Sequence, residues 1–311
     1  MIQPPTPTFI VLLFVLLARE GWGQGARTDL PDRLKQATGL SPKDRWLTPF
    51  QLDNEDLGRL EAVQKYEVPD TFTLATSQSY FHTDNVYLTR NGRRSSSAWA
   101  GLFDLSYVPY STYRWTPRLG VEQFVFRFWN EPRANFDGQT AFVSSHLDLT
   151  RDQAWSWDIA CSLSRYEGNQ YKTYPYRQVE VGTGLNWQHP LSRNHAVSVF
   201  GTYEINGRLT APKALTRIEN ALSFGLIYRP LDQVSIQPYV QTALHYYPAD
   251  TALQRNRHDF NLIAGLALTW TPTKNFSLGG GFNWTGNYSS LRYFDYDVAL
   301  PAIGLFGSIG F

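Results

Sequence analysis

Apolar and polar residues alternate with a period of two along most of the chain after residue 70. The stretch 260–270 places Phe, Leu, Ala, Leu, Leu and Trp at its even positions, and Asn, Ile, Gly, Ala and Thr between them. The stretches 276–284 and 179–187 repeat this arrangement, and each ends on Trp. A period of two is the signature of a β-strand with two different environments. The pattern therefore predicts strands with one apolar and one polar face.

Twelve segments carry this alternation and are predicted as strands. They are 71–83, 98–108, 117–128, 139–149, 154–166, 177–188, 195–206, 218–229, 233–247, 258–270, 275–286 and 298–311. Two of them fit less well. The segment 117–128 predicts a bulge near Glu122–Gln123, where the apolar positions shift phase, and 71–83 loses phase before Tyr80. Counts of ten or fourteen strands therefore stay open.

The connections between these segments alternate in length. Short turns are predicted at 151–153, 190–194, 230–232 and 271–274, with a slightly longer one at 109–116. Long polar loops are predicted at 84–97, 129–138, 167–176, 207–217, 248–257 and 287–297. Strands of this length at ~45° tilt are sufficient to cross a membrane, which takes about 9–11 residues. Short turns on one side and long loops on the other favour a membrane barrel over a soluble β-sandwich.

The end of the chain points to the same class. Phe311, Ile309, Leu305 and Ile303 share one face of the last segment, and the chain stops on an aromatic residue. This ending resembles the closing strand of bacterial outer-membrane β-barrels. Across residues 71–311 the resemblance is to the porin-like superfamily, with no narrower family matched. It implies an all-β antiparallel transmembrane barrel in the bacterial outer membrane, in which Ile309 and Phe311 belong to an assembly signal read by the insertion machinery.

The beginning of the chain predicts export. Residues 9–17 form an unbroken apolar run followed by small residues around Gly23. As a helix this run would rise only ~14 Å, too little to span a hydrocarbon core of ~30 Å. Residues 1–25 are therefore predicted as a signal peptide, with an uncleaved anchor as the alternative. Residues 26–70 are charged and partly helical in pattern, and are predicted as a periplasmic segment that serves as a plug, a contact or a linker.

Composition narrows the class. Aromatic residues are 15% of the chain, charged residues only 18%, and the net charge is +1, which gives no argument for nucleic acid as a partner. A single cysteine, Cys161, excludes an internal disulfide framework and a Cys-based zinc cluster. No cofactor or metal site is predicted. The far ends of the alternating segments predict an aromatic girdle where lipid meets water. Its candidates are Trp155, Trp187, Trp270 and Trp284.

The polar face of the predicted strands supplies candidates for the lumen. Charge is costly in lipid, about 2–4 kcal/mol for a cation at the midplane, so these side chains are expected to face inward. The set is Asp104, Glu122, Arg127, His146, Asp148, Asp158, Glu180, Glu204, Glu219 and Arg229. Seven acids against two arginines predict a cation-preferring passage. A structural polar network that packs the lumen is the alternative.

The predicted loops are basic and could contact phosphate groups of lipopolysaccharide, so lipids and lipopolysaccharide are expected partners. Oligomeric state is not fixed by the sequence. The outer-membrane phospholipase signature Asn-His-x-Ser-Asn-Gly has no match, because Ser144-Ser145-His146 lacks both asparagines and the order. No other catalytic motif is present, so no enzyme is expected. The predicted function is a passive channel for small polar solutes. The alternatives are a closed structural or secretion-accessory barrel and a lipid-modifying enzyme.

Overall fold

The computed structural model describes residues 69–150, 152–168, 176–192, 196–211, 213–248, 256–273 and 275–311. The predicted signal peptide and nearly all of the segment 26–70 lie outside these residues. Twelve strands are present: β1 Phe72–Thr83, β2 Ser96–Tyr107, β3 Trp115–Phe128, β4 Phe136–Asp148, β5 Trp155–Gly168, β6 Tyr176–Pro190, β7 Val197–Ala211, β8 Arg217–Leu231, β9 Val234–Tyr247, β10 Arg257–Thr273, β11 Phe276–Ser289 and β12 Tyr296–Gly310. Short 3₁₀ turns occupy Pro132–Ala134 (η2), Lys213–Leu215 (η3) and Arg292–Phe294 (η4).

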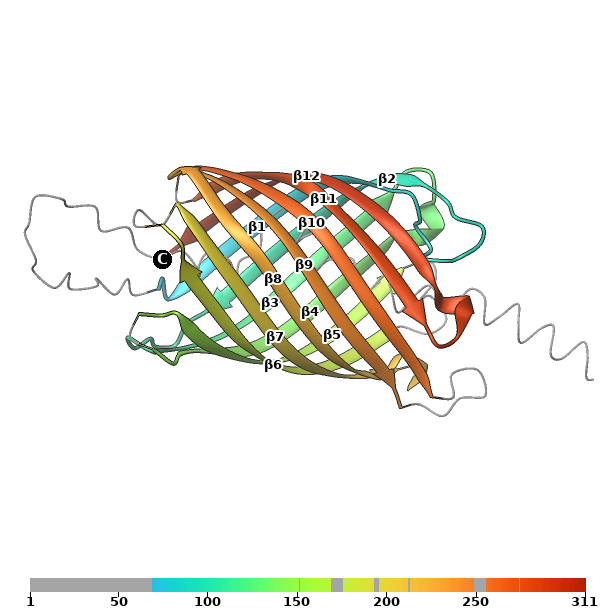
Figure 1. Cartoon of the computed structure of the whole chain (residues 1–311), viewed down its shortest axis with the longest axis horizontal. Helices are drawn as coiled ribbons and strands as arrows, with labels where there is room; N and C mark the ends of the chain where they lie inside the picture. Colours follow the sequence, from blue (N-terminus) through green and yellow to red (C-terminus); the bar gives the residue numbers. More distant parts are fainter. Residues whose placement is uncertain are drawn as a thin grey trace, which may run out of the picture.

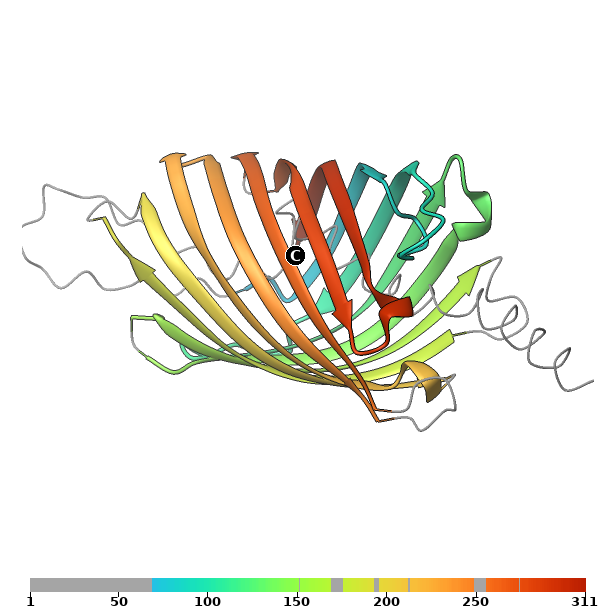
Figure 2. The same cartoon turned by 45° about the vertical axis from the view of Figure 1, so that its right-hand side comes forward.

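The strands form one closed antiparallel barrel in which each strand pairs with its neighbours in sequence and β1 pairs with β12 (Figure 1). This confirms the predicted fold class and the count of twelve. Closure pairs the backbone within the sheet, which a lipid environment requires. We call the end that holds the start of β1 and the end of β12 the turn end, and the opposite end the loop end. The β1–β2 and β3–β4 connections, η3 and η4 lie at the loop end (Figures 1 and 2).

The strands have 12 to 17 residues each, and all except β1 and β9 are longer than the alternation predicted. Most of the extra residues lie at the loop end, where β7 continues to Ala211 and β8 and β10 begin at Arg217 and Arg257. The predicted bulge in β3 is wrong, because its pairing with β2 runs without a shift from Leu119 to Phe128. The predicted loss of phase in β1 is also wrong, because its pairing with β2 is unbroken from Phe72 to Thr83.

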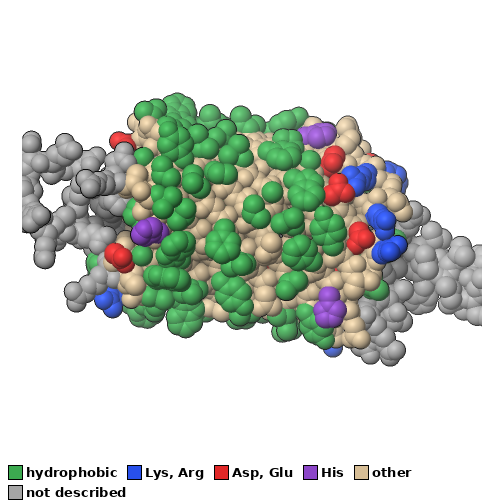
Figure 3. All heavy atoms as spheres, viewed as in Figure 1, with side chains coloured by type: hydrophobic (Ala, Val, Ile, Leu, Met, Phe, Trp, Pro, Cys, Tyr) green, Lys and Arg blue, Asp and Glu red, His purple; other side chains and the backbone are tan. Residues whose placement is uncertain are grey.

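The outer face of the barrel is a broad apolar belt (Figure 3). Large side chains such as Leu163 (58% exposed), Val181 (54%) and Leu268 (45%) stand outward on neighbouring or opposite strands. In an aqueous protein such an area would be an aggregation site, since exposed apolar patches usually cover only a few hundred Å². Charged side chains on this view gather toward the loop end (Figure 3). The belt is the surface expected of a protein surrounded by lipid.

Aromatic residues border the belt at the turn end. Trp155 and Trp187 are register partners on β5 and β6, with ring centroids 6.2 Å apart. Trp270 stands outward near the turn end of β10, 46% exposed. Trp284 lies instead in the loop-end half of β11, opposite Ala299 of β12. Rings at the rims of the belt suit the interface between lipid and water.

The last strand closes the barrel against the first. Ile309 pairs with Leu74, and both stand outward. The backbone N–H and C=O of Phe311 bond to those of Phe72, and their rings stack at 5.7 Å. The terminal residue therefore completes the β1–β12 seam at the turn end. Separately, among the residues that the structure describes, no helix has the length and apolarity needed to cross a membrane.

Candidate functional site in the barrel interior

The inner face carries most of the ionisable side chains of the strands. Alternation and register place eight acids inward: Asp104, Glu122, Asp148, Asp158, Glu180, Glu204, Glu219 and Asp259. Five arginines and two histidines share this face: Arg118, Arg208, Arg217, Arg229, Arg257, His146 and His245. The interior of the described strands is therefore less acidic than the sequence predicted.

Arg127 is a correction to the predicted lumen set. It pairs in register with Trp99 and shares the outer face with Leu119 and Val121. Its guanidinium binds Asp137 at 2.6 Å near the loop end, where both side chains are exposed. The inward positions of this part of β3 belong instead to Phe124, Phe126 and Phe128, which are 1–4% exposed.

Two polar groups lie in the turn-end half of the interior. Asp104 is fully buried and is held by Arg118 at 2.7 Å. Further round the wall, His146 lies between Asp158, 2.7 Å from Nδ1, and Asp148, 3.3 Å from Nε2. His146 thus contacts a carboxylate through each of its ring nitrogens. Asn186 donates to the second oxygen of Asp158 at 2.6 Å.

A second polar network crosses β6 to β9 at the loop end. Arg208 contacts Glu180 at 3.0 Å, and Gln178 donates to the same carboxylate at 2.7 Å. Arg217 and His245 both contact Glu219, at 2.9 and 3.1 Å. These arginines are nearly buried, so their pairing with acids compensates for the loss of water.

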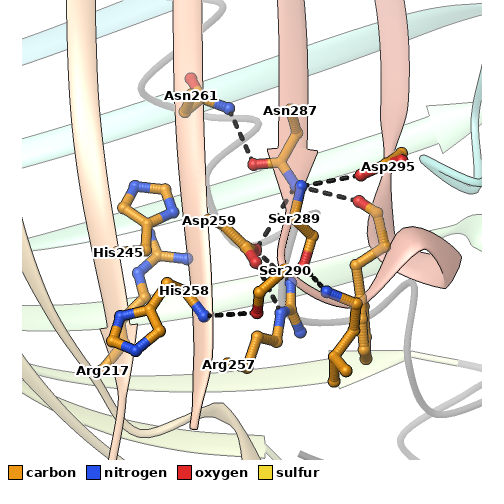
Figure 4. A network of polar contacts seen from close by, with 12 residues as sticks. Arg217, His245, Arg257, His258, Asp259, Asn261, Asn287, Ser289, Ser290 and Asp295 are labelled. Atoms are coloured by element: carbon orange, nitrogen blue, oxygen red, sulfur yellow. Dashed lines mark hydrogen bonds and ion pairs between the residues drawn. The ribbon is translucent and has the colours of Figure 1, made fainter.

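The network is extended by Arg257 of β10, which contacts Asp259 (Figure 4) and lies between aromatic rings on β9 and η4. Its guanidinium carbon lies 4.2 Å from the ring centre of Tyr247 and 3.4 Å from that of Phe294, and it forms an ion pair with Asp259. Asn287 donates to Asp259 at 3.4 Å and to the carbonyl of Phe294 at 2.9 Å. Cation–π contacts of this kind add stability when desolvated. They hold η4 against the inner wall.

The wall facing this network is apolar. A buried cluster lines the loop-end interior of β12 and β1 to β6. Its members are Phe81, Val86, Ala98, Ala100, Phe124, Phe126, Phe128, Ala134, Phe136, Tyr166, Tyr176 and Leu300. Rings within it stack or meet edge to face, as Phe126 and Phe136 do at 4.7 Å. The loop-end interior thus has an aromatic wall opposite a charged one.

Inward glycines let several side chains lie flat along the wall. A Cβ on Gly138 would lie 2.1 Å from the Phe124 ring, and one on Gly225 would lie 2.4 Å from the Phe200 ring. A Cβ on Gly184 would come within 3.3 Å of Glu204. Glycine is the residue that permits such close approach. The two phenylalanine rings and the Glu204 side chain therefore lie against the sheet and away from the barrel axis.

Water reaches part of the inner wall. The side chain of Asp158 is 43% exposed, that of His146 26% and that of Glu180 22%. On the opposite side, inward residues of β10 to β12 such as Asn283 and Leu300 are 1–2% exposed. The accessible space therefore runs along β4 to β7, away from the filled side.

Sequence reasoning missed six inward residues: Arg118, His245 and Asp259, together with Arg208, Arg217 and Arg257, which were assigned to outer loops. The alternation of inward and outward residues could have located them. Arg217, for example, is two residues from Glu219 and so faces the same side of β8. Among the described residues, no group of three or more His, Cys, Asp or Glu could hold a metal ion.

The loop end carries ion pairs among the connections and the start of β12. Arg93 pairs with Asp297, Arg90 approaches Asp295 at 3.6 Å, and Arg94 contacts Glu131 at 3.1 Å. Burial would raise the pKa of Glu131, but hydrogen bonds from Tyr87 and Arg94 outweigh it and lower that pKa. The loop arginines thus engage protein acids.

No protein-family model matches the sequence, and no curated protein matches it. Solved structures do match. The COG4313 outer membrane channel from Pseudomonas putida F1 superposes with a TM-score of 0.56 at 10% identity, over 83% of this chain and 100% of that one. The translocator domain of the autotransporter NalP from Neisseria meningitidis gives 0.50 at 11% identity, over 76% and 87%. The KdgM porin in complex with disordered oligogalacturonate gives 0.43 at 10%, over 76% and 99%.

These structures are outer-membrane β-barrels, and the present chain has their fold. The predicted resemblance to outer-membrane β-barrels is thereby confirmed at the level of the fold. Identities near 10% show the fold alone, and function on one fold varies with the site grafted on it.

Proposed function

We propose that the protein is a porin-like passive channel of the bacterial outer membrane for small polar solutes, with a weak preference for cations. The observation that carries the proposal is the partly exposed charged wall of β4 to β6, where Asp158, His146 and Glu180 face the interior and still reach water. Charged groups that line an accessible passage select ions by sign. The side chains of Phe200 and Glu204, which lie flat against Gly225 and Gly184, support an open passage.

The charge balance sets the expected selectivity. Four inward arginines are mostly buried and pair with acids, namely Arg118, Arg208, Arg217 and Arg257. Eight acids against five arginines and two histidines leave the inner wall only weakly acidic, less so than the predicted seven acids against two arginines and one histidine. Salt screens such charges over ~8–10 Å at physiological strength. The preference for cations should therefore be modest and should grow as salt is lowered.

Single-channel recording on the refolded full chain tests this. Glu204→Gln keeps the size of the side chain, removes one inward charge and leaves the Glu180–Arg208 ion pair in place. Glu167→Gln, at an outward, 59% exposed site, is the matched control. We expect a cation-selective reversal potential, reduced by Glu204→Gln and unchanged by Glu167→Gln. Anion selectivity would contradict the charge assignment.

A closed structural barrel is the second candidate, because the interior of β10 to β12 is filled and the aromatic cluster packs tightly. Complete absence of conductance by the folded protein would favour it. In either case we propose that residues 1–25 direct export and that the outer-membrane insertion machinery assembles the barrel. We propose no catalytic activity. Lipids and lipopolysaccharide are proposed as the surroundings, and among the described loop residues Arg90, Arg93 and Arg94 already contact acids.

A further inference from the structure

The seam between β1 and β12 is incomplete at the loop end. Their pairing runs from Thr73–Gly310 to Phe81–Ala302 and stops there, although β12 continues to Tyr296. In the described residues, the stretch Tyr296–Pro301 has a strand partner only on the β11 side. At about 3.3 Å per residue, this leaves roughly 15–20 Å of strand edge in the barrel wall.

The sequence itself interrupts the ladder at this point. Odd-numbered residues of β12 direct their backbone bonds toward β1, as the Phe311–Phe72 pair shows. Pro301 has this parity and lacks the N–H that would reach β1. Pro238 of β9 also stands within a strand, but β8–β9 pairing resumes on both sides of it, at Gly225–Tyr239 and Tyr228–Ile236. At Pro301 it does not resume.

Side chains of the β1–β2 loop replace the missing ladder. Asp84 accepts a bond from the N–H of Ala299 at 2.9 Å, and Asn85 donates to the carbonyl of Asp297 at 3.1 Å. Asn85 is fully buried and also donates to the carbonyl of Thr89. An unpaired edge is otherwise an open site for other groups. These two side-chain hydrogen bonds, from here on called side-chain caps, close the barrel wall at this point, whereas strand pairing closes it elsewhere.

The interior behind this seam is apolar. Phe81, in the last β1–β12 register pair, and Leu300, the next inward residue of β12 beyond that pair, belong to the aromatic cluster, and Val86 of the β1–β2 loop packs into it. Outside, Tyr80 and Trp129 lie 5.0 Å apart and are exposed, as expected for rings at a lipid–water interface. The weak seam therefore separates an apolar interior from the interfacial level of the membrane.

We propose that the β1–β12 seam above Phe81 is a side portal, closed by the β1–β2 loop, through which small apolar molecules enter the loop-end interior from the membrane interface. Opening requires the loop to leave Ala299 and Asp297, which breaks the two side-chain caps and the ion pairs of Arg93 and Arg90 with Asp297 and Asp295, but breaks no strand pair. This route is separate from the polar passage along β4 to β7 and does not depend on it.

A reversible lock tests the portal. In a Cys161→Ser background, Asp84→Cys with Ala299→Cys places two thiols across the seam, because the carboxylate of Asp84 already reaches Ala299. The probe is N-phenyl-1-naphthylamine, which fluoresces in apolar surroundings and is held back by a lipopolysaccharide leaflet. Its entry is measured in intact cells carrying the full chain. Thr83→Cys with Ser96→Cys is the control, since it bridges partners in the completed β1–β2 seam.

We expect oxidation of the 84–299 pair to lower probe entry to the rate of cells without the protein, and reductant to restore it. The 83–96 bridge should change nothing. Asp84→Ala with Asn85→Ala should raise entry on the order of tenfold, because each lost cap shifts the open–closed balance a few fold. Equal entry in oxidised and reduced forms of the 84–299 variant would overturn the portal. Ion conductance is recorded in parallel. Loss of the redox effect on probe entry with intact conductance would contradict the portal alone, and a redox effect on probe entry without conductance would contradict the channel alone.

Discussion

Gly138→Ala is expected to destabilise the barrel through one identifiable contact. An added Cβ would lie 2.1 and 2.2 Å from two ring atoms of Phe124. Carbon atoms prefer separations of about 3.5–4.0 Å, so the ring must move by roughly 1.5 Å. It has little room, because Phe124 is 4% exposed and contacts Phe126, Phe136 and Tyr166. Overpacking of this kind costs about 1–3 kcal/mol.

The matched control is Gly207→Ala. The nearest atom to its added Cβ is the carbonyl oxygen of Val181 at 3.9 Å, an ordinary contact. Its effect should fall within about 0.5 kcal/mol of zero, or be stabilising through the unfolded chain. The folded fraction is measured by gel mobility across a guanidinium series, approached from the folded and unfolded sides. In a Phe124→Leu background the cost of Gly138→Ala should largely vanish, since the ring edge is gone. Equal midpoints for Gly138→Ala and Gly207→Ala would refute the reasoning.

Three further outcomes are expected. Deleting Phe311 should lower outer-membrane levels far more than Ser308→Ala on the inner face, as measured by fractionation and blotting; equal levels would remove any special role for the terminal ring. Arg257→Ala should cost about 3–5 kcal/mol in guanidinium unfolding because it leaves Asp259 buried without its cation. The lowered pKa of Glu131 stabilises its loop contact above the ordinary value of 4.5, and this contribution is lost as pH falls through the lowered pKa; protease cleavage of the β1–β2 loop should therefore rise at acid pH, and Glu131→Gln should abolish that pH dependence.

Much of the architecture follows from alternation alone. The period of two predicted the twelve strands, because a barrel between lipid and a polar interior demands two faces. It failed on β3, where Leu119 and Val121 face lipid while Phe124, Phe126 and Phe128 face inward. Both environments are apolar there, so the pattern cannot say which face a run of phenylalanines occupies. A bulge was the interpretation that kept them all outside, and it placed Arg127 on the wrong face.

The ends of the strands were the second source of error. A span needs only about 9–11 residues, so Arg208, Arg217 and Arg257 fell into predicted loops. The strands continue beyond that length, and the inner face continues with them. Arginines that end up buried in ion pairs were therefore counted as exposed rim charges. The pairing of Asp104 with Arg118 across two strands depends on register, which alternation does not fix.

The position of the loop-end ion pairs has a consequence for how the chain enters the membrane. Arg217 pairs with Glu219, and Arg257 with Asp259, two residues apart on a single strand. Each pair can form before the neighbouring strands arrive, because both partners project from the same face of one strand. A strand then carries its cation already neutralised when it meets the apolar phase, where an isolated charge is costly. Separating the partners onto different strands would leave the finished wall with the same charges and make each strand harder to insert.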